Sequence, residues 1–306
     1  MKNTEFDLCV AGHFAIDTIK LPNIKKPVLT LGGPPTYASV AARKLGANVT
    51  VISKVGEDFP QEFLKQLEKQ GVDLSFVHVV EKAKTTSFVL EYLNEDRILK
   101  IKALTPKILN KDLPVSLRVK VMHVSPIANE VSPEVFKKLR SLCQILSLDP
   151  QGYVRKILKN GTLELKKWKD VEILQQTDIF KSNRKEIQKI VETKDLRSAM
   201  RTLADHGIKI VIVTLGFKGT SLFFENSFYH VPPYPSRKFV DPTGAGDVFA
   251  GAFLAEYVSG KNPVWCACVG NAAASFVVEK VGPKGFGSKK GIYKRATQLY
   301  EIVMKE

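Results

Sequence analysis

Short apolar runs alternate with amphipathic stretches along most of the chain. The runs at residues 6–12 (FDLCVAG), 48–56 (NVTVISKVG) and 119–125 (VKVMHVS) are largely apolar, which is typical of strands buried on both faces of a sheet. Residues 36–46 and 59–71 instead repeat small or apolar residues at helical spacing, and each segment ends in a glycine. A terminal glycine of this kind predicts the C-cap of a helix.

The same alternation continues through the second half of the chain. Strand-like runs at residues 145–152, 177–183 and 208–216 are separated by helical segments, and residues 219–231 have the pattern of a β-hairpin. Strands that alternate with helices predict a mostly parallel sheet with helices on both faces. We therefore expect an α/β fold in a single domain over residues 1–306.

The period of the pattern changes between residues 76 and 104. Residues 85–93 (TTSFVLEYL) and 97–103 (RILKIKA) alternate apolar and polar side chains, and a turn-forming sequence at 94–96 separates them. Alternation of period two is typical of half-exposed antiparallel strands. We predict a small antiparallel sheet, formed from about residues 13–31 and 76–104, that is inserted in the domain and covers it as a lid.

Composition excludes several classes of protein. The chain has 306 residues, of which 44% are hydrophobic, and this is enough for a large core. No apolar run approaches the roughly 18 residues that a membrane span needs. The four cysteines are scattered and form neither a disulfide framework nor a zinc cluster. We expect reduced, buried thiols in a cytoplasmic protein with no membrane partner.

The formal net charge of +15 is the one extreme value in the composition. A basic surface can attract nucleic acids or acidic substrates. The lysines, however, are spread over many predicted helices, and the sequence has no basic tail, zinc finger or RNA-binding aromatic motif. We therefore expect a solvated, lysine-rich surface and no nucleic-acid partner.

The stretch DPTGAGDVFAGAFLAEYVSG, residues 241–260, carries the clearest chemistry. Gly244, Ala245 and Gly246 precede an apolar helical run, and the first-turn amides of a helix lack intrahelical partners and attract anions. Asp247 would repel a bound anion, but as a base it could take a proton from a substrate hydroxyl while the amides hold a transferring phosphoryl group. The alternative is an ordinary helix start with an acidic residue in its first turn.

Two other phosphate-binding motifs are absent from the sequence. Residues 282–287 have the glycine spacing of a Walker motif but continue with Ser288 and Lys289 instead of Lys-Ser. Gly12, after the first predicted strand, is not followed by the further glycines of a dinucleotide-binding turn. These differences argue against a P-loop enzyme and a dinucleotide oxidoreductase.

Four motifs together resemble those of the ribokinase-type (PfkB) carbohydrate kinases, and the resemblance covers nearly the whole chain. The carboxyl-terminal signature D-x-T-G-A-G-D is present at 241–247, and the amino-terminal signature begins with the double glycine Gly32-Gly33. The motif N-x-x-E occurs at 183–186, and T-x-G-x-x-G occurs at 214–219. Each motif is weak alone, so their order and separation carry the resemblance.

The resemblance implies a ribokinase-like three-layer α/β/α sandwich with a mostly parallel central sheet and a small antiparallel lid. It also implies that Asp247 is the catalytic base and that the amides of residues 244–247 form an anion hole. ATP and Mg²⁺ are the implied cofactors, with Asn183 and Glu186 organising the metal through water, although these two residues could simply form a capping box. The residues implied in nucleotide binding are Asn183, Glu186, Thr214, Gly216, Gly219, Asn271 and Gly282.

The same resemblance implies an acceptor site. Where this chain has Tyr37 the family pattern has an asparagine, and ribokinases proper have GGKGAN in place of Gly-Gly-Pro-Pro-Thr-Tyr. Ribose is therefore a doubtful acceptor, and the ring of Tyr37 would suit stacking on a base. The residues expected at the acceptor are Asp17, Gly32, Gly33, Tyr37, Asn129 and Asp149.

The sequence thus predicts transfer of the γ-phosphate of ATP to a hydroxyl of a small sugar or of a cyclic polyol similar to inositol. A nucleoside kinase of the same family is the first alternative, and a non-catalytic sugar- or nucleotide-binding protein on this fold is the second. The aspartate and glycines that a silent relative would lose are present. A homodimer formed through the lid sheet is also expected, because an exposed sheet favours association.

Overall fold

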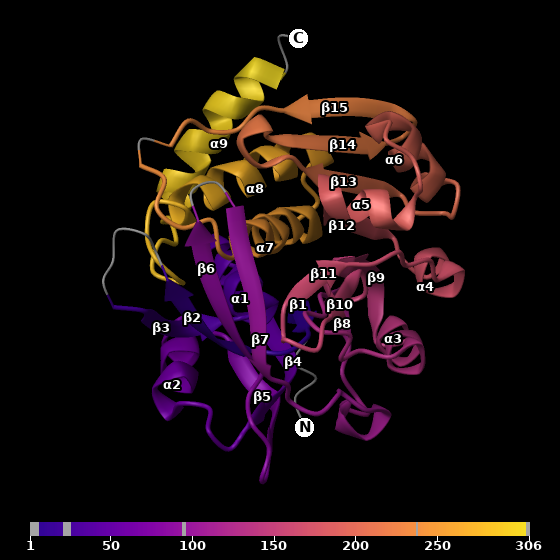
Figure 1. The fold of residues 1–306 in the computed structure, drawn as a ribbon. Coiled ribbons are helices and arrows are strands. Elements are labelled where there is room, and N and C mark those ends of the chain that lie inside the picture. Colours follow the sequence, from indigo (N-terminus) through magenta and orange to yellow (C-terminus); the bar gives the residue numbers. More distant parts are fainter. Residues whose placement is uncertain (1–5, 21–25, 94–95, 237, 304–306) are drawn as a thin grey trace.

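Nine strands form one central sheet in the part of the chain that the structure, a computed structural model, describes: residues 6–20, 26–93, 96–236 and 238–303 (Figure 1). The strands are β1 (Phe6–Ala11), β4 (Val49–Gly56), β5 (Asp73–Val80), β8 (Val119–Val124), β9 (Cys143–Leu148), β12 (Ile179–Asn183), β13 (Ile210–Thr214), β14 (Thr220–Phe224) and β15 (Ser227–Val231). Their order is β15-β14-β13-β12-β9-β8-β1-β4-β5. All pairings from β5 to β13 are parallel, and only the hairpin β14–β15 adds antiparallel pairings.

Successive residues of these strands face opposite sides of the sheet. In β1, Leu8 and Val10 pack into one core, whereas Cys9 and Ala11 pack into the other. A strand that is buried on both sides has no polar face. This arrangement explains why the strands of the parallel region are visible in the sequence as nearly continuous apolar runs.

Helices cover both faces of the central sheet (Figure 1). The first core lies between the sheet and a helical layer that contains α1 (Pro34–Leu45), α2 (Gln61–Lys69), α7 (Ala245–Val258), α8 (Pro263–Val277) and α9 (Lys289–Val303). The second core lies between the sheet and α3 (Pro133–Arg140), α4 (Val171–Gln175), α5 (Arg184–Ile190) and α6 (Leu196–Ala204). The predicted three-layer α/β/α sandwich with a mostly parallel sheet is confirmed.

A separate four-stranded sheet forms the predicted lid. Its strands β2 (Ala15–Lys20), β3 (Val28–Gly32), β6 (Ser87–Leu93) and β7 (Asp96–Ala103) lie in the order β3-β2-β6-β7. The two outer pairings are antiparallel, and the central pairing of β2 with β6 is parallel. A small core of its own contains Ile19, Phe88 and Leu90.

One predicted boundary of the lid is wrong. Residues 76–80 were expected in the lid, but they belong to β5, which pairs with β4 at the edge of the central sheet. β5 is half-exposed along most of its length. An edge strand with one solvated side has the same alternating pattern as a lid strand, so the pattern alone does not separate the two sheets.

A short hairpin connects the lid to the chain that follows β9. Its strands β10 (Arg155–Ile157) and β11 (Leu163–Leu165) pair in antiparallel fashion. Between them, the carbonyl of Gly161 accepts a hydrogen bond from the amide of Ile101 on β7 at 2.8 Å, and Thr162 forms a bridge with Lys100. Strand β7 of the lid therefore contacts this hairpin in addition to its neighbour β6.

None of the helices in the described residues is long and apolar enough to cross a membrane. All four cysteines are free thiols; Cys9, Cys266 and Cys268 are buried and Cys143 is half-buried. Burial raises the pKa of Cys268 to about 12, so this thiol is protonated and unreactive at neutral pH.

Candidate active site

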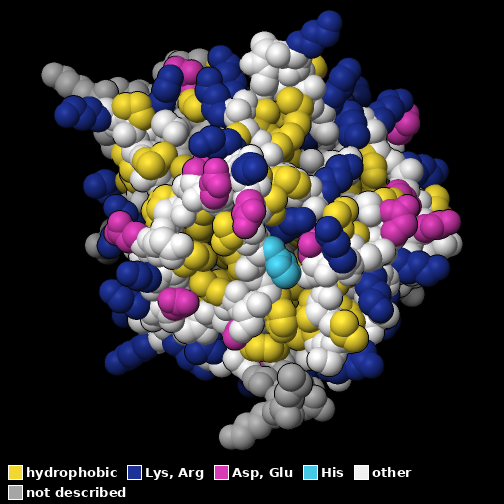
Figure 2. All heavy atoms as spheres, turned by 90° about the horizontal axis from the view of Figure 1, so that it is seen from below, with side chains coloured by type: hydrophobic (Ala, Val, Ile, Leu, Met, Phe, Trp, Pro, Cys, Tyr) yellow, Lys and Arg dark blue, Asp and Glu magenta, His cyan; other side chains and the backbone are white. Residues whose placement is uncertain are grey.

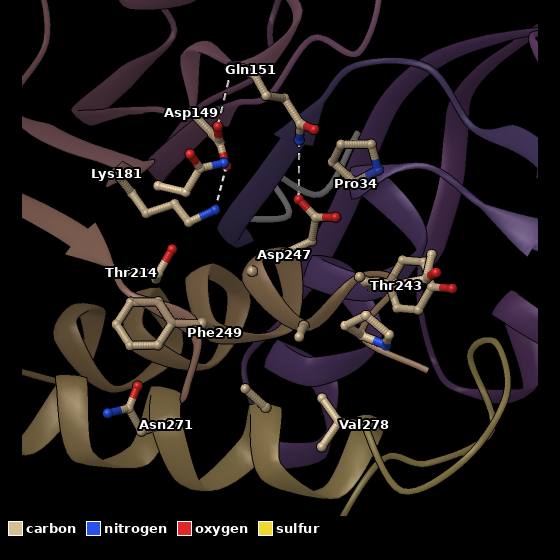
Figure 3. Close-up of a pocket in the computed structure, with 18 of the residues that line it drawn as sticks. Pro34, Asp149, Gln151, Lys181, Thr214, Thr243, Asp247, Phe249, Asn271 and Val278 are labelled. Atoms are coloured by element: carbon tan, nitrogen blue, oxygen red, sulfur yellow. Dashed lines mark hydrogen bonds and ion pairs between the residues drawn. The ribbon is translucent and has the colours of Figure 1, made fainter. Parts of the chain in front are cut away.

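A cavity of about 700 Å³ opens between the lid, the start of α7 and the carboxyl ends of three strands of the central sheet (Figure 3). Open α/β sheets bind ligands at this edge. Side chains from separate motifs of the sequence line it together: Asp149 after β9, Asn183 at the end of β12, Thr214 at the end of β13 and Asp247 in the first turn of α7. The fold therefore brings the chemically distinctive segments of the chain to one place.

A buried carboxylate fixes the loop that leads into α7. Asp241 is only 1% exposed, and its Oδ1 accepts hydrogen bonds from the amide of Thr243 at 2.9 Å and from the hydroxyl of Tyr92 at 3.0 Å. Its Oδ2 accepts a third from the amide of Gly282 at 3.0 Å. Several donors are needed to stabilise a buried charge. Because Tyr92 lies on β6, Asp241 also connects this loop to the lid.

Gly244 is the N-cap of α7 and adopts a left-handed conformation with φ 75° and ψ 0°. Glycine is favoured in this conformation, and a Cβ at position 244 would also collide with the ring of Tyr37. The amide of Ala245 donates within the turn to the carbonyl of Pro242 at 3.2 Å. The amide of Ala245 is therefore engaged within the turn, and the amides of Gly244, Gly246 and Asp247 are the candidates for the predicted anion hole.

Asp247 faces the cavity with a carboxylate that carries an unusual pKa. Burial raises this pKa to about 6; the charge of Asp149 contributes, while Lys181, Arg155 and a hydrogen bond from Gln151 act in the opposite direction. Gln151 Nε2 donates to Asp247 Oδ1 at 3.2 Å. A carboxylate whose pKa lies near the operating pH is suited to accept a proton from a hydroxyl.

Lys181 is a cation of the site that the sequence motifs did not identify. It lies on β12, is 6% exposed, and forms an ion pair of 2.6 Å with Asp149 Oδ2 (Figure 3). Its ammonium lies beside the first turn of α7, because a Cβ on Gly246 would be only 2.9 Å from Nζ. Burial alone would lower the pKa of Lys181, but the charges of Asp149, Asp247 and Glu186 outweigh this effect and raise it. The available signal was a lysine inside the otherwise buried strand TDIFKSN.

Asn183 and Glu186 form the capping box that begins α5. The amide of Asn183 donates to Glu186 Oε2 at 2.9 Å, and the amide of Glu186 donates to Asn183 Oδ1 at 2.9 Å. Both residues also line the cavity. Burial and the charge of Asp149 raise the pKa of Glu186, so this carboxylate would be stabilised by a cation. The structural and the metal-related interpretations of this motif are thus compatible.

The residues expected to bind a nucleotide lie along the other half of the cavity. Thr214, Gly216, Gly219 and Asn271 line it, and Gly216 and Gly219 have positive φ values of 60° and 80°. Asn271 Oδ1 accepts a hydrogen bond from Thr220 Oγ1 at 2.7 Å, and its Nδ2 donates to the carbonyls of Val231 and Pro232. This side chain therefore holds the end of β15 against α8. Its carboxamide therefore shapes the wall.

Gly282 does not belong to the cavity lining in the described part of the chain; its amide instead supports Asp241. Two aromatic residues that the sequence did not single out do line the same half. Phe217 is 75% exposed and Phe239 is 49% exposed, and their rings contact each other with centroids 4.7 Å apart. Exposed aromatic rings at the mouth of a cavity suit a planar ligand.

Four of the six residues expected at the acceptor line the cavity, namely Asp17, Gly33, Tyr37 and Asp149. Gly32 and Asn129 are not among the described lining residues. Gly32 packs against the Asp17 carboxylate, where a Cβ would collide with it. Asn129 lies in a loop with a left-handed φ of 62°, which asparagine tolerates well, so its position reflects backbone conformation.

Tyr37 does not offer the stacking surface that the sequence suggested. The side chain is 1% exposed, and its ring packs under Gly244 and beside Phe286. Burial, with the charges of Asp17 and Asp241, raises the pKa of Tyr37 well above its usual value. A ring buried to this extent supports the loop of the anion hole and has no open face for a base.

The lid supplies an apolar wall to the acceptor side of the cavity. Phe88 and Leu90 on β6, Leu99 on β7 and Ile127 after β8 line this region. Phe88, Leu90 and Ile127 are nearly buried and pack in one apolar cluster. Asp17 on β2 pairs in register with Phe88 on β6, so this carboxylate lies beside the wall on the same sheet. The sequence motifs gave no indication of the wall.

The pattern that describes the pfkB family carbohydrate kinases matches residues 3–289 of the chain. The chain belongs to this family. The kinase is 31% identical over 281 residues to a cytidine kinase of Thermococcus kodakarensis, covering 90% of this chain and 97% of that protein. It is 26% identical to an inositol 3-kinase of Arabidopsis thaliana, covering 90% and 75% of the two chains.

The fold of the kinase is shared with solved structures. A pyrophosphate-dependent kinase in the ribokinase family, complexed with a pyrophosphate analog and myo-inositol, superposes with a TM-score of 0.79 at 22% identity, over 94% of this chain and 99% of that one. The predicted ribokinase-like fold is therefore confirmed. The protein is a phosphotransferase whose relatives phosphorylate sugars, polyols or nucleosides, and this agrees with the activity expected from the sequence.

Proposed function

We propose that this kinase transfers the γ-phosphate of ATP to a hydroxyl of a nucleoside. The observation that carries the proposal is the apolar wall of Phe88, Leu90, Leu99 and Ile127 on the acceptor side. A nucleobase has two apolar faces that would bury against this wall, whereas a cyclic polyol has hydroxyls around its whole rim. The cytidine kinase of T. kodakarensis, at 31% identity, supports the same assignment. The sequence alone favoured a sugar or cyclic polyol as the acceptor. The proposal instead takes the first alternative, a nucleoside.

In this arrangement the acceptor spans the cavity. Its base rests on the lid wall, and its ribose hydroxyls face the Asp17 carboxylate, which is 5% exposed on β2. The remaining primary hydroxyl then lies toward Asp247 at the start of α7. Contact with Asp17 and Asp247 together orients the acceptor, which converts part of the binding energy into a lower barrier.

The chain's own groups divide the reaction between them. Asp247 takes the proton of the attacking hydroxyl, and the amides of Gly246 and Asp247 donate to the phosphoryl oxygens as charge develops on them. Lys181, held by Asp149 beside the same turn, adds a fixed positive charge to this region. The lid and the packed walls exclude water, so the acceptor and not solvent is phosphorylated.

The donor half of the cavity fits ATP with Mg²⁺. Glu186 and Asn183 supply oxygen atoms, which are the ligands that Mg²⁺ prefers, and this ion usually keeps several waters and binds one or two carboxylates plus substrate phosphates. When bound, the ion would neutralise charge on the phosphates.

The adenine of ATP would lie near Phe217 and Phe239 at the mouth of this half. Pyrophosphate is the other donor to consider, because a structural neighbour is described as pyrophosphate-dependent. Pyrophosphate has no base to contact the two rings. We therefore favour ATP.

The test is a panel of acceptors assayed for ADP release with ATP and Mg²⁺: cytidine, uridine, adenosine, ribose and myo-inositol. A nucleoside should give the highest kcat/KM, and Leu99→Asn should lower kcat/KM for that nucleoside about tenfold, since a polar group in the wall costs about 1–3 kcal/mol. Turnover of ribose should be unaffected by Leu99→Asn. Highest activity with myo-inositol, together with no turnover of nucleosides, would refute the proposal.

We also propose a homodimer in the cytoplasm. Leu29 on the edge strand β3 of the lid is 61% exposed, and pairing of lids would cover it. The free thiols agree with a reducing compartment. Sedimentation of the wild type and of Leu29→Lys would distinguish a lid-mediated dimer from a monomer.

A further inference from the structure

The carboxamide of Gln151 lies between the candidate base and an arginine. Gln151 belongs to the short 3-10 helix Pro150–Gly152 that follows β9. Its Nε2 donates to Asp247 Oδ1 at 3.2 Å and to Ser125 Oγ at 3.3 Å, and its Oε1 accepts from Arg155 Nη2 at 2.7 Å. Figure 3 shows Gln151 reaching down to Asp247 from the side opposite α7.

Arg155 determines which end of this carboxamide faces the base. A guanidinium only donates hydrogen bonds, so the atom that it contacts has to be the oxygen Oε1. The amide nitrogen is then directed at Asp247, whose carboxylate only accepts. Arg155 is itself fixed, because its Nη1 donates to the carbonyl of Ile127 at 3.0 Å. Arg155, Gln151 and Asp247 thus form a chain of two hydrogen bonds, and each bond has only one possible donor.

This chain fixes the orientation of the Asp247 carboxylate. A carboxylate on a short side chain can rotate about χ2 with little cost, and Lys181 is a nearby cation that attracts it. The bond from Gln151 occupies Oδ1, and in Figure 3 the other carboxylate oxygen points away from Gln151. One oxygen is thereby held as the acceptor of a fixed N–H, and the other is presented to the cavity.

We propose that Gln151 and Arg155 are positioning residues for the base, and that Arg155 orients the carboxamide of Gln151. The charge of Arg155 also acts on Asp247 directly. The inference rests on the proposed function, since Asp247 is taken as the base. The charged groups around Asp247 are Lys181 on β12, Asp149 after β9 and Arg155 on β10, and Tyr37 on α1 is coupled to it electrostatically. Gln151 itself is uncharged, so a carboxylate in its place changes the balance of charge around Asp247 directly.

Gln151→Glu tests the role of the N–H donor. It replaces the donor by a second carboxylate at hydrogen-bonding distance from Asp247, and like charges at this distance raise the pKa of one of them by about one unit or more. The acidic limb of the kcat/KM–pH profile, which reports the free enzyme, should therefore move to higher pH by about one unit. The matched control is Gln176→Glu at the C-cap of α4, away from the cavity, where Nε2 donates to the carbonyl of Glu172, and its profile should coincide with that of the wild type.

Gln151→Ala separates positioning from binding. It should lower kcat about tenfold while the KM for the acceptor changes less than twofold. Arg155→Gln should also lower kcat, and the loss in the double variant should be smaller than the product of the two single losses, because the two residues share one hydrogen bond. Melting temperatures near that of the wild type establish that each variant is folded. An unshifted acidic limb in Gln151→Glu, or a raised acceptor KM with unchanged kcat in Gln151→Ala, would overturn the proposal.

A second measurement keeps the inference independent of turnover. The ¹³C carboxyl resonance of Asp247 can be titrated without any substrate in the wild type and in Gln151→Glu. A higher midpoint in the variant supports the contact even if none of the tested acceptors is phosphorylated, in which case only the proposed substrate class fails. Equal midpoints in both proteins would contradict the inference.

Discussion

The carboxylate of Asp247 is buried next to side chains of both positive and negative charge. The net result is a pKa raised to about 6, with burial as the largest cause. Since the base acts in its deprotonated form, a raised pKa means that activity is present above about pH 6 and is lost as the pH falls through this value. The same burial increases the affinity of the carboxylate for a proton, which suits it to deprotonate a hydroxyl.

Asp247→Asn should lower kcat by about 10²- to 10⁴-fold, which is the usual contribution of a general base. The substitution keeps the shape of the side chain, so the affinity for ATP, measured by calorimetry, should change little. The residual activity should also lack the acidic limb near pH 6 that the wild type shows. Full turnover in the variant would exclude Asp247 as the base.

The sequence predicted the residues with a recognisable spacing and missed those that act through space. Asp247, Asn183 and Thr214 belong to contiguous motifs, and all of them line the cavity. Lys181 and Arg155 have no motif of their own. The role of Lys181 depends on Asp149, 32 residues away in the chain, and Arg155 is held by the carbonyl of Ile127, 28 residues away. Periodicity and local spacing contain no information on such contacts.

At the level of secondary structure, Tyr92 joins two elements that are far apart in the sequence. Its hydroxyl lies 3.0 Å from Asp241 Oδ1 and 2.7 Å from Thr243 Oγ1, so strand β6 of the lid is tied to the loop before α7. This loop leads to Gly244 and to the first turn of α7, which contains Gly246 and Asp247. A lid that moves away from the cavity would break these bonds and leave the buried Asp241 with one donor fewer.

Tyr92→Phe should lower kcat about tenfold, because loss of a hydrogen bond to a buried charge costs about 1–3 kcal/mol and 1.4 kcal/mol corresponds to a factor of ten. Tyr293→Phe is the matched control: it removes a tyrosine–carboxylate bond of 2.7 Å to Glu256, between α9 and α7. Steady-state kinetics should show wild-type kcat in the control, although both variants should melt at lower temperature. Equal kcat in Tyr92→Phe and the wild type would show that this contact has no role in turnover.

The sequence pattern predicted correctly those strands that are buried on both faces. β1, β8 and β13 are nearly continuous apolar runs because helices cover both sides of the sheet. β5 was placed in the wrong sheet because a half-exposed edge strand and a lid strand share one period. The pairing of β2 with β6 joins segments about 70 residues apart, and no local pattern specifies such a register.

For the whole molecule, the net charge of +15 contrasts with the acidic cavity. Among the described residues, four carboxylates line the cavity (Asp17, Asp149, Glu186 and Asp247), against two cations, Lys181 and Arg155. Figure 2 shows lysine and arginine side chains scattered over the face seen from below, with acidic residues among them and no continuous basic stripe on that face. A diffuse positive field acts over long distance, whereas the carboxylates act only within the cavity.

ATP is an anion, so this field should speed its approach to the protein. Raising the salt concentration from about 50 to about 300 mM should slow the association of a fluorescent ATP analogue several-fold, because the Debye length falls from about 14 to about 6 Å. The KM of an uncharged acceptor should be nearly constant over the same range. Stopped-flow rates that do not depend on salt would contradict steering by the surface charge.

The hairpin of β10 and β11 joins the lid to the base through one stretch of backbone. Arg155 begins this hairpin, and the carbonyl of Gly161 in it accepts the amide of Ile101 from the lid strand β7. The hydrogen of that amide can exchange with deuterium only when lid and hairpin separate. Its exchange rate therefore reports how often the lid separates from the segment that holds Gln151 against Asp247. The measurement uses a backbone amide outside the cavity and needs no catalytic turnover.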